Sequence, residues 1–156
     1  MTRPDWLPAD FQHPTVVQAT PDVHLRPIRA SDVDIDMVAV LGNQEMLWSI
    51  YGEAWQWPPA TMTREQDEED LAHHAADMEE HRSFNYAILR SDESELLGCV
   101  YIEPIEPDLP AGIAEVSWWL VGSASPELRS RMDRLVPEWI ERDWPFTEVR
   151  YPYNKR

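Results

Sequence analysis

Residues 84–121 read FNYAILR (84–90), SDES (91–94), ELLGCVYIEPI (95–105) and, after a short connection, AGIAEVSWWLV (111–121). The first stretch alternates in side-chain character with a period of two, which is typical of a β-strand. The second is apolar at nearly every position and predicts a central strand that is covered on both faces. SDES is typical of a turn. Because both connections are short, the whole segment predicts an antiparallel meander.

The segments before the meander predict one strand and two main helices. VHLRPIR (23–29) predicts a strand, in which Pro27 favours an edge position or a bulge because proline cannot donate a ladder hydrogen bond. Helical apolar spacing follows this strand, and residues 44–60 predict a short helix with an aromatic loop. Thr63 and Gln66 form a capping-box pattern before a helix over about 64–82.

The segments after the meander predict a helix and a last strand. Ser125, Pro126 and Glu127 supply an N-cap, a proline at the first helical position and an acid at the second. EVRYPYN (148–154) follows a strand–helix–strand crossover, so it should run parallel to residues 113–121. The expected fold is a mixed α/β (α+β) domain in the order β-α-α-β-β-β-α-β, with a mostly antiparallel sheet flanked by helices.

The domain organisation is expected to be simple. Residues 1–22 carry four prolines and scattered aromatic residues without a period, so we expect an extended N-terminal arm. Trp6 and Phe11 are candidates to hold that arm against the body or against a second subunit. Residues 23–156 contain no repeat, low-complexity tract or linker, so we expect them to form a single domain.

Composition restricts the classes of function. The formal net charge is −16, which disfavours binding to nucleic acids and to anionic membranes. The N-terminus lacks the apolar region of a signal peptide, and no stretch approaches the roughly 20 apolar residues of a membrane span. The single cysteine, Cys99, lies in an apolar run and is interpreted as a buried thiol in a reducing compartment. These features indicate a cytoplasmic protein.

The order of elements, together with three sequence patterns, resembles the GNAT (GCN5-related N-acetyltransferase) superfamily over roughly residues 23–154. The first pattern is RPIRASD (26–32), an edge strand that ends in a helix start. The second is the meander with LLGCVYI and AEVSWWLV, and the third is PELRSRMDRLVPEWI (126–140) followed by a strand. The resemblance implies a GNAT-like fold. The family continues after the fifth strand with a helix and two strands, whereas this chain is truncated there.

The resemblance also implies a binding site for acetyl-CoA. In the family, backbone at the end of the fourth strand pairs with the pantetheine arm, and this role falls to Leu120 and Val121. A glycine-containing loop then wraps the pyrophosphate, and Arg129, Ser130 and Arg131 match the start of its motif. Two further positions, Met132 and Arg134, depart from the pattern because they stand where the family has glycine or alanine. An arginine clamp that replaces the loop and simple ion pairing on a helix surface are both open interpretations.

Glu115 is the candidate general base, since the resemblance implies a glutamate near this position that deprotonates the amine. A carboxylate among apolar side chains holds a proton more readily, which suits that role. Its alternative is a glutamate on a solvated side of the sheet. The candidate substrate-binding residues are aromatic, because an aromatic cluster can bind an amine by cation–π contact. They are Trp48, Tyr51, Trp55 and Trp119. A core or dimer-face role for the cluster is the alternative.

The resemblance therefore implies an N-acetyltransferase that uses acetyl-CoA and no metal, with a small amine or peptide amine as acceptor. The histidines of HHAADMEEH (73–81) are interpreted as a solvated helix face rather than a metal site. The alternative function is a non-catalytic GNAT-fold protein that binds a ligand or forms a homodimer through its sheet edge and Trp-rich segments. The two departures from the loop pattern favour this alternative.

Overall fold

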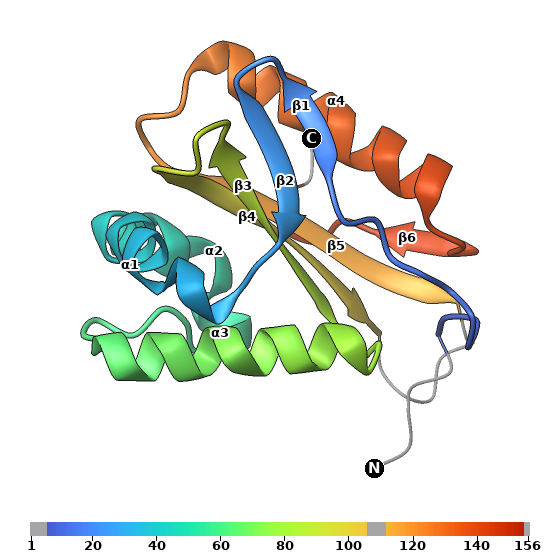
Figure 1. Cartoon of the computed structure of the whole chain (residues 1–156), viewed down its shortest axis with the longest axis horizontal. Coiled ribbons are helices and arrows are strands. Elements are labelled where there is room, and N and C mark those ends of the chain that lie inside the picture. The colour runs from blue at the N-terminus through green and yellow to red at the C-terminus, as the bar shows by residue number, and fades with distance from the viewer. Residues whose placement is uncertain (1–5, 106–111, 155–156) are drawn as a thin grey trace.

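Six strands form one sheet within the residues that this computed structural model describes, which are 6–105 and 112–154. Parts of the expected arm and of the strand expected from residue 111 lie outside the described residues. The strands follow one another across the sheet in chain order (Figure 1). They are β1 (Val17–Thr20), β2 (Val23–Pro27), β3 (Phe84–Arg90), β4 (Leu96–Pro104), β5 (Ile113–Leu120) and β6 (Glu148–Arg150). All neighbours are antiparallel except β5 and β6, which are parallel.

Helices cover both faces of this sheet. The first helical segments are η1 (Ala30–Asp32), α1 (Val33–Gly42), α2 (Gln44–Trp55) and α3 (Arg64–Glu79), and the last helix is α4 (Pro126–Asp143). Figure 1 shows α1, α2 and α3 on one side of the sheet and α4 on the other. Two of the starts follow the predicted capping chemistry: the Thr63 hydroxyl accepts from the backbone of Gln66, and the Ser125 hydroxyl accepts from Leu128. None of the described helices is long and apolar enough to cross a membrane.

The predicted meander and the parallel direction of the last strand are both confirmed, but that strand ends at Arg150 rather than at Asn154. The structure adds one strand that the sequence pattern did not predict, because β1 lies within the segment expected as an arm and pairs with β2. Pro27 is accordingly not on an outer strand of the sheet. Its missing N–H is tolerated because the pairing of β1 with β2 ends at Val17 and Leu25, before Pro27 is reached.

Aromatic residues of the arm lie against the body, as expected. Trp6 is 6% exposed and donates its indole N–H to the carbonyl oxygen of His81. Its ring stacks on Phe146, with ring centroids 5.4 Å apart. Phe11 contacts Trp144 beyond the end of α4. The arm therefore contacts the residues that follow the C-terminal ends of α3 and α4, which lie on opposite sides of the sheet.

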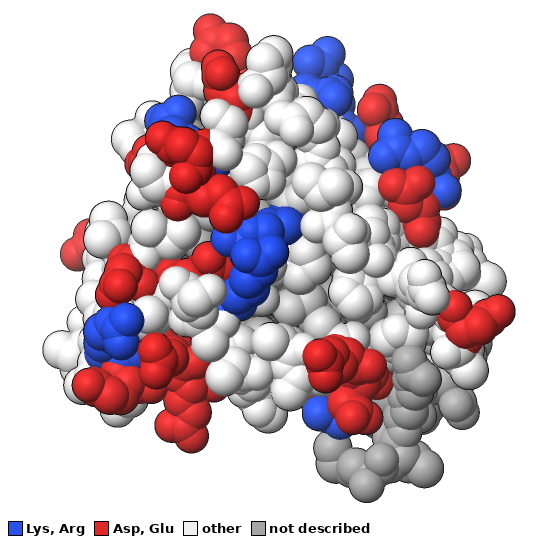
Figure 2. Space-filling view, viewed as in Figure 1, with Lys and Arg blue, Asp and Glu red and all other residues white. Residues whose placement is uncertain are grey.

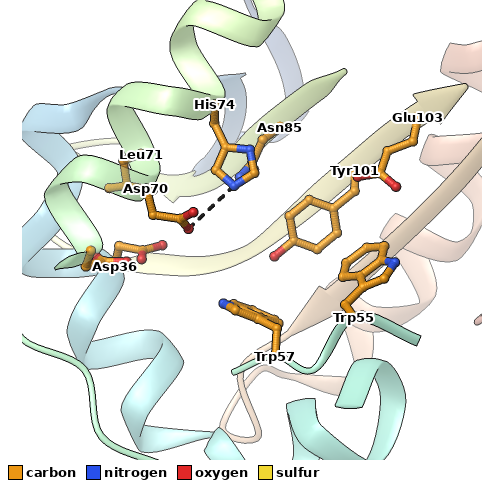
Figure 3. Close-up of a pocket in the computed structure, with 10 residues that line it drawn as sticks. Asp36, Trp55, Trp57, Asp70, Leu71, His74, Asn85, Tyr101 and Glu103 are labelled. Atoms are coloured by element: carbon orange, nitrogen blue, oxygen red, sulfur yellow. Dashed lines mark ion pairs between the residues drawn. The ribbon is translucent and has the colours of Figure 1, made fainter. Parts of the chain in front are cut away.

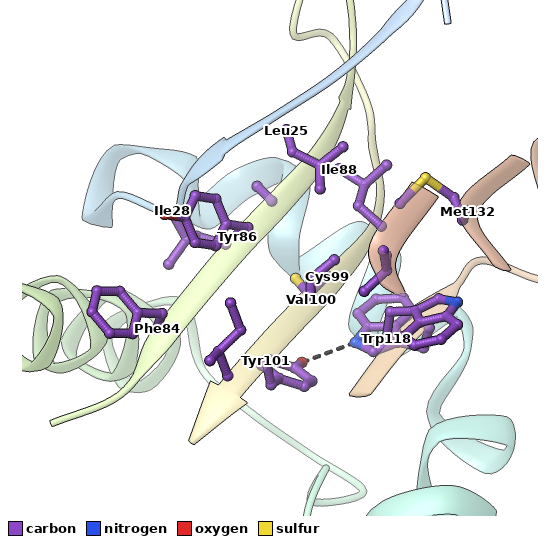
Figure 4. Close-up of a cluster of buried hydrophobic side chains, with 14 of the residues drawn as sticks. Leu25, Ile28, Phe84, Tyr86, Ile88, Cys99, Val100, Tyr101, Trp118 and Met132 are labelled. Atoms are coloured by element: carbon purple, nitrogen blue, oxygen red, sulfur yellow. Dashed lines mark hydrogen bonds between the residues drawn. The ribbon is translucent and has the colours of Figure 1, made fainter. Parts of the chain in front are cut away.

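The core lies on both faces of β3 and β4. On the face toward α4, Tyr86 meets Trp139 edge-on, and Met132 is fully buried beneath the sheet (Figure 4). On the opposite face Cys99 is 1% exposed, which confirms the expected buried thiol. Gly98 is required at its position because a Cβ there would lie 1.9 Å from the carbonyl oxygen of Trp119. The close approach of β4 and β5 at this point sets the path of the strand that carries the candidate site.

A buried ion-pair network joins β2 to the first helical segment. The guanidinium of Arg26 donates to both oxygens of Asp32, at 2.9 and 2.8 Å, and both side chains are under 10% exposed. It also donates to both carboxylate oxygens of Glu93 in the turn between β3 and β4. Hydrogen bonds from Arg26 and His24 lower the pKa of Glu93 to about 2. Asp32, at the start of the first helical segment, is the buried centre of this network.

Candidate functional site

The edge of β5 that faces β6 is only partly covered by a strand. β6 pairs with three residues at the beginning of β5, the last pair being Glu115 with Arg150. Further along, the side chain of Asn154 accepts from the N–H of Trp118 at 3.1 Å and donates to its carbonyl at 3.0 Å. Alternate residues of a strand direct their backbone groups to the same edge, so Leu120 presents its N–H and C=O there as Trp118 does. Val121 points the other way and donates to Leu97.

A cavity of about 230 Å³ lies along this edge, between α2, α4 and the C-terminal segment. We call it the edge cavity. Its lining residues are Met46, Ile50, Trp118, Trp119, Leu120, Arg129, Asp133 and Asn154. The guanidinium of Arg129 closes one side by donating to the carbonyl oxygens of Val121 and Gly122, at 2.7 and 3.3 Å. This cavity therefore has an apolar wall, a backbone edge and one cation.

Two carboxylates face each other across β4 and β5. The register of β4 and β5 places Glu103 opposite Glu115 and Tyr101 opposite Ser117, so these four side chains share one face of the sheet. Burial, and then the charge of Glu115, raises the pKa of Glu103. Glu103 therefore holds a proton more readily than an exposed glutamate does.

Aromatic rings enclose this carboxylate pair. Tyr51 is fully buried and donates its hydroxyl to Ser117 at 3.1 Å, and burial raises the pKa of its phenol. Trp55 stacks on Tyr51 with ring centroids 4.4 Å apart. Tyr153, from the C-terminal segment, meets both rings edge-on. The C-terminal segment thus covers the face of β5 that carries Glu115 and Ser117.

A second cavity, of about 340 Å³, opens on the other side of Glu103. We call it the acidic cavity (Figure 3). Helices α1 and α3 supply one wall, and strands β3 and β4 with the end of α2 supply the other. Its lining residues are Asp36, Trp55, Trp57, Asp67, Asp70, Leu71, His74, Asn85, Tyr101 and Glu103. Four carboxylates and one imidazole therefore share one cavity with three aromatic side chains.

Burial shapes the protonation of this cavity. Burial, a shared hydrogen bond with Asp67 and neighbouring charges raise the pKa of Asp36, and burial also raises the pKa of Asp67. The hydrogen bond from His74 lowers the pKa of Asp70, and the two side chains lie 3.6 Å apart. Burial lowers the pKa of His74, but the hydrogen bond and charge of Asp70 outweigh it and raise the pKa overall. His74 is the basic residue among those that line the cavity.

The sequence-predicted residues are only partly brought together. Tyr51, Trp55 and Glu115 meet around Ser117, and Trp119 donates its indole N–H to Tyr101 at 2.9 Å. Trp48 is 43% exposed and lines none of the described cavities. The preceding residue of α2, Leu47, faces the core, so Trp48 is turned toward the surface. The aromatic cluster is therefore split between the site and the surface.

The segment matched to the pyrophosphate loop is helical. Arg129, Ser130 and Arg131 belong to the first two turns of α4, and Met132 behind them is buried in the core. Arg131 donates to the carbonyl oxygen of Ala19 and so ties α4 to β1. Ser130 is exposed. Of the three, Arg129 alone lines the edge cavity.

Sequence reasoning missed most of the acidic cavity. Asp67 and His74 lie four residues before and three residues after Leu71, so they share the buried face of α3. This spacing from Leu71 was the signal in the sequence that could have revealed the cavity. Charged residues on the same helix face as buried apolar residues are unusual when that face is solvated. Glu103 was missed because its place opposite Glu115 depends on the strand register. No group of three or more His, Cys, Asp or Glu side chains among residues 6–105 and 112–154 has an arrangement that could hold a metal ion.

Surface charge agrees with an acidic protein. On the face shown in Figure 2, acidic side chains gather near both ends of α3, and the basic side chains form small separate patches. No continuous basic surface is visible on this face.

Comparisons with known proteins agree with the architecture. A family model described as "Acetyltransferase (GNAT) domain" matches residues 22–149. A comparison with curated proteins yields no match.

Among solved structures, the chain is similar to the apo form of RimL, a ribosomal L7/L12 alpha-N-protein acetyltransferase. The TM-score is 0.65 at 18% identity, over 90% of this chain and 72% of that one. RimL in complex with coenzyme A matches with a TM-score of 0.66 at 17% identity, over 84% and 70%. Ribosomal-protein-S5-alanine acetyltransferase from Vibrio fischeri matches with a TM-score of 0.62 at 16% identity, over 81% and 67%.

Proposed function

Because the chain belongs to the GNAT acetyltransferase domain family, we propose that it transfers an acetyl group from acetyl-CoA to the amine of a small or peptide acceptor. The observation that carries this proposal is the position of the carboxylate pair on β4 and β5. Glu103 lines the acidic cavity, and it lies opposite Glu115 on β5, the strand whose residues Trp118 to Leu120 line the edge cavity. One cavity offers a backbone edge and apolar walls, and the other offers carboxylates and aromatic rings. These are suitable surfaces for a thioester donor and a cationic acceptor, respectively.

The edge cavity fits the pantetheine part of acetyl-CoA. Leu120 directs backbone groups to the free edge, where an amide-bearing chain can pair as a strand would. Met46 and Ile50 of α2 provide apolar contact. When bound, acetyl-CoA supplies an acetyl thioester that is reactive toward a neutral amine. Val121 serves indirectly, because its carbonyl positions the guanidinium of Arg129.

The pyrophosphate part fits less well. A glycine-containing loop would present several backbone N–H groups to phosphate, but residues 129–134 are helical, so their backbone N–H groups are used within α4. Arg129 is the cation at this end of the edge cavity, and it can bind phosphate oxygens after releasing the carbonyls of Val121 and Gly122. Binding of the donor therefore rests on the β5 edge and on one arginine.

The carboxylate pair is suited to removing the proton of an ammonium acceptor. An amine held at this point can transfer its proton to a carboxylate oxygen of Glu115, directly or through one water molecule. The raised pKa of Glu103 means that this neighbouring carboxylate accepts a proton at a higher pH than an isolated glutamate does. The hydrogen bond between Tyr51 and Ser117 fixes the side chain of Ser117, which lies on the same face of the sheet as the carboxylate pair.

The direct test is an acetyl-transfer assay that follows release of the CoA thiol with a panel of primary amines and basic peptides. We expect thiol release that requires both the protein and an amine, with the acetylated amine detected by mass spectrometry. Thiol release that is the same with and without amine, or no release with any acceptor, would contradict the proposal.

The hydrogen bonds of Asn154 lead to a prediction about donor affinity. Its side chain occupies the N–H and C=O of Trp118, so the C-terminal segment competes with any ligand that pairs with this edge. We expect Asn154→Ala to tighten acetyl-CoA binding by about five- to thirtyfold, as follows from removing two competing hydrogen bonds of about 0.5–1 kcal/mol each. Isothermal calorimetry measures the change. Asn43→Ala is the control, because half-buried Asn43 donates to Ala39 and accepts from Gly122 but does not bond Trp118. Weaker binding by Asn154→Ala would contradict the prediction and show that Asn154 supports the ligand.

A non-catalytic binding or dimerising role is the second candidate. It is favoured by the helical state of residues 129–134 and by the exposed apolar side chains of Val38 and Trp48 on neighbouring helices α1 and α2. Analytical ultracentrifugation separates this role from the first. A stable dimer without acetyl transfer supports it, whereas a monomer that transfers acetyl groups excludes it.

A further inference from the structure

The acidic cavity lacks a cation to match its carboxylates. Asp36, Asp67, Asp70 and Glu103 line it, and no Arg or Lys does. His74 is paired with Asp70 alone. Asp36 and Asp67 are 4% and 2% exposed, so water screens their charge poorly. Elsewhere in the described protein buried carboxylates have a partner of opposite charge, as Asp32 has in Arg26.

Two polar atoms in the same cavity point to a ligand independently of the charge. The Oδ2 atom of Asp67 and the Oδ1 atom of Asn85 are buried and have no hydrogen-bond partner among the described residues. Both side chains are more than nine-tenths buried and line the cavity. Leaving a buried acceptor unpaired costs about 1–3 kcal/mol, and more for a charged group. Both atoms are acceptors, so the missing partner is a hydrogen-bond donor.

Aromatic rings complete the lining. Trp55, Trp57 and Tyr101 are in mutual contact through Tyr51, and Figure 3 shows their rings directed toward the cavity opposite His74 and Asp70. Faces of Trp and Tyr attract ammonium groups, by about 0.5–2 kcal/mol for each well-placed ring. A donor that carries positive charge therefore meets carboxylates on one side and π-systems on the other.

We infer that the acidic cavity binds the distal ammonium of a small diamine or polyamine, whose other amine lies beside Glu115 as the acetyl acceptor. This inference rests on the proposed function for the identity of the second amine. The carboxylates stand at two ends of the site: Asp36 and Asp67 lie between α1 and α3, and Glu103 lies beside Glu115 on the sheet. A chain with a cation at each end satisfies both groups, whereas a monoamine leaves one of them unpaired. Three hydrogens on an ammonium can serve Asp67 and Asn85 together.

The test compares the binding of two probes that share a four-carbon chain, in the absence of acetyl-CoA. Isothermal calorimetry of the full chain with 1,4-diaminobutane and with n-butylamine measures what the second charge contributes. We expect the diamine to bind at least about tenfold more tightly, a difference of about 1.4 kcal/mol. Asp67→Asn keeps the side-chain shape and removes the carboxylate whose Oδ2 atom lacks a partner among the described residues, so it should abolish most of the difference. Asp34→Asn is the matched control, because Asp34 is on α1 but exposed and paired with Arg64.

Each outcome decides the inference separately from the proposed function. Equal binding of both probes, or an Asp67→Asn variant that retains the preference, would overturn it even if acetyl transfer occurs. Tighter binding of the diamine without acetyl transfer would support the diamine site in the acidic cavity and contradict the proposed acetyltransferase activity. Binding of a lysine-rich peptide but of neither small probe would also overturn it, and would assign the cavity to a basic protein segment. Circular dichroism of Asp67→Asn confirms that the variant is folded.

Discussion

We expect Glu115→Gln to lower kcat/KM for the proposed acetyl transfer by about 10²–10⁴, the usual contribution of a positioned general base. The amide keeps the size of the side chain and its place opposite Glu103, but it cannot accept the proton of the ammonium. The loss should appear mainly in kcat, because the carboxylates of the acidic cavity that bind the acceptor remain. Initial rates over a range of acceptor concentrations, followed by release of the CoA thiol, measure both parameters.

Glu148→Gln is the control for this variant. Glu148 is exposed on β6, where it accepts from Arg150, and it lies outside the described cavities. We expect its kcat/KM to remain within about twofold of that of the original protein. Loss of an exposed ion pair changes the stability of the fold by only roughly 0–1 kcal/mol, so the folded site is left intact. A Glu115→Gln variant that is as active as this control would remove Glu115 from the reaction, and Glu103→Gln would then be the variant to examine.

Arg26→Leu lowers the free energy of unfolding by about 3–5 kcal/mol, because it leaves a buried carboxylate without its partner. Asp32 is 5% exposed and would retain a hydrogen bond from the backbone N–H of Arg29 but lose both bonds from the guanidinium. Glu93 would lose its anchor at the same time. Urea unfolding followed by tryptophan fluorescence measures the change.

Arg64→Leu provides the comparison for stability. Arg64 also pairs with an aspartate, but its side chain is 52% exposed and that of Asp34 is 74% exposed. Its removal should cost no more than about 1 kcal/mol. Equal effects of the two substitutions would contradict the account of a buried network that holds β2 to the start of α1.

Much of the fold could be predicted from local signals. The period-two pattern of β3, the apolar run of β4 and the capping residues Thr63 and Ser125 each act within a few residues, so they can be recognised without tertiary contacts. β1 was missed because a strand of four residues with two outward positions has too little pattern to separate it from an extended arm. Its pairing with β2 is a long-range property of the sheet.

The candidate site was harder to predict for two physical reasons. The partner of Glu115 depends on register, and a shift of one residue between β4 and β5 would place Glu103 on the opposite face. The roles of Trp48 and Trp55 depend on the rotation of α2 about its axis, which burial of Leu47 and Tyr51 decides. A list of aromatic residues in the sequence contains no information about that rotation.

The structure also explains why the chain has a GNAT-like fold but lacks the glycines of the family's pyrophosphate loop. Ser125 starts α4 before the residues that match the pyrophosphate loop, so the loop cannot form at residues 129–134. Met132 is fully buried at the position expected for a glycine, where it packs in the core rather than facing a ligand. The sequence predicted this departure, and the fold explains it. Under the proposed function, the donor makes fewer phosphate contacts than the family motif provides.

Calorimetric titration of the full chain with acetyl-CoA, alongside Arg129→Ala and Arg142→Ala, tests the central claim most directly. Arg129 lines the edge cavity, whereas Arg142 lies exposed at the far end of α4 and pairs with Asp143. We predict saturable binding with Kd on the order of micromolar, weakened at least about tenfold by Arg129→Ala and unchanged by Arg142→Ala. No heat of binding up to millimolar acetyl-CoA would contradict the account, because a transferase must hold its donor.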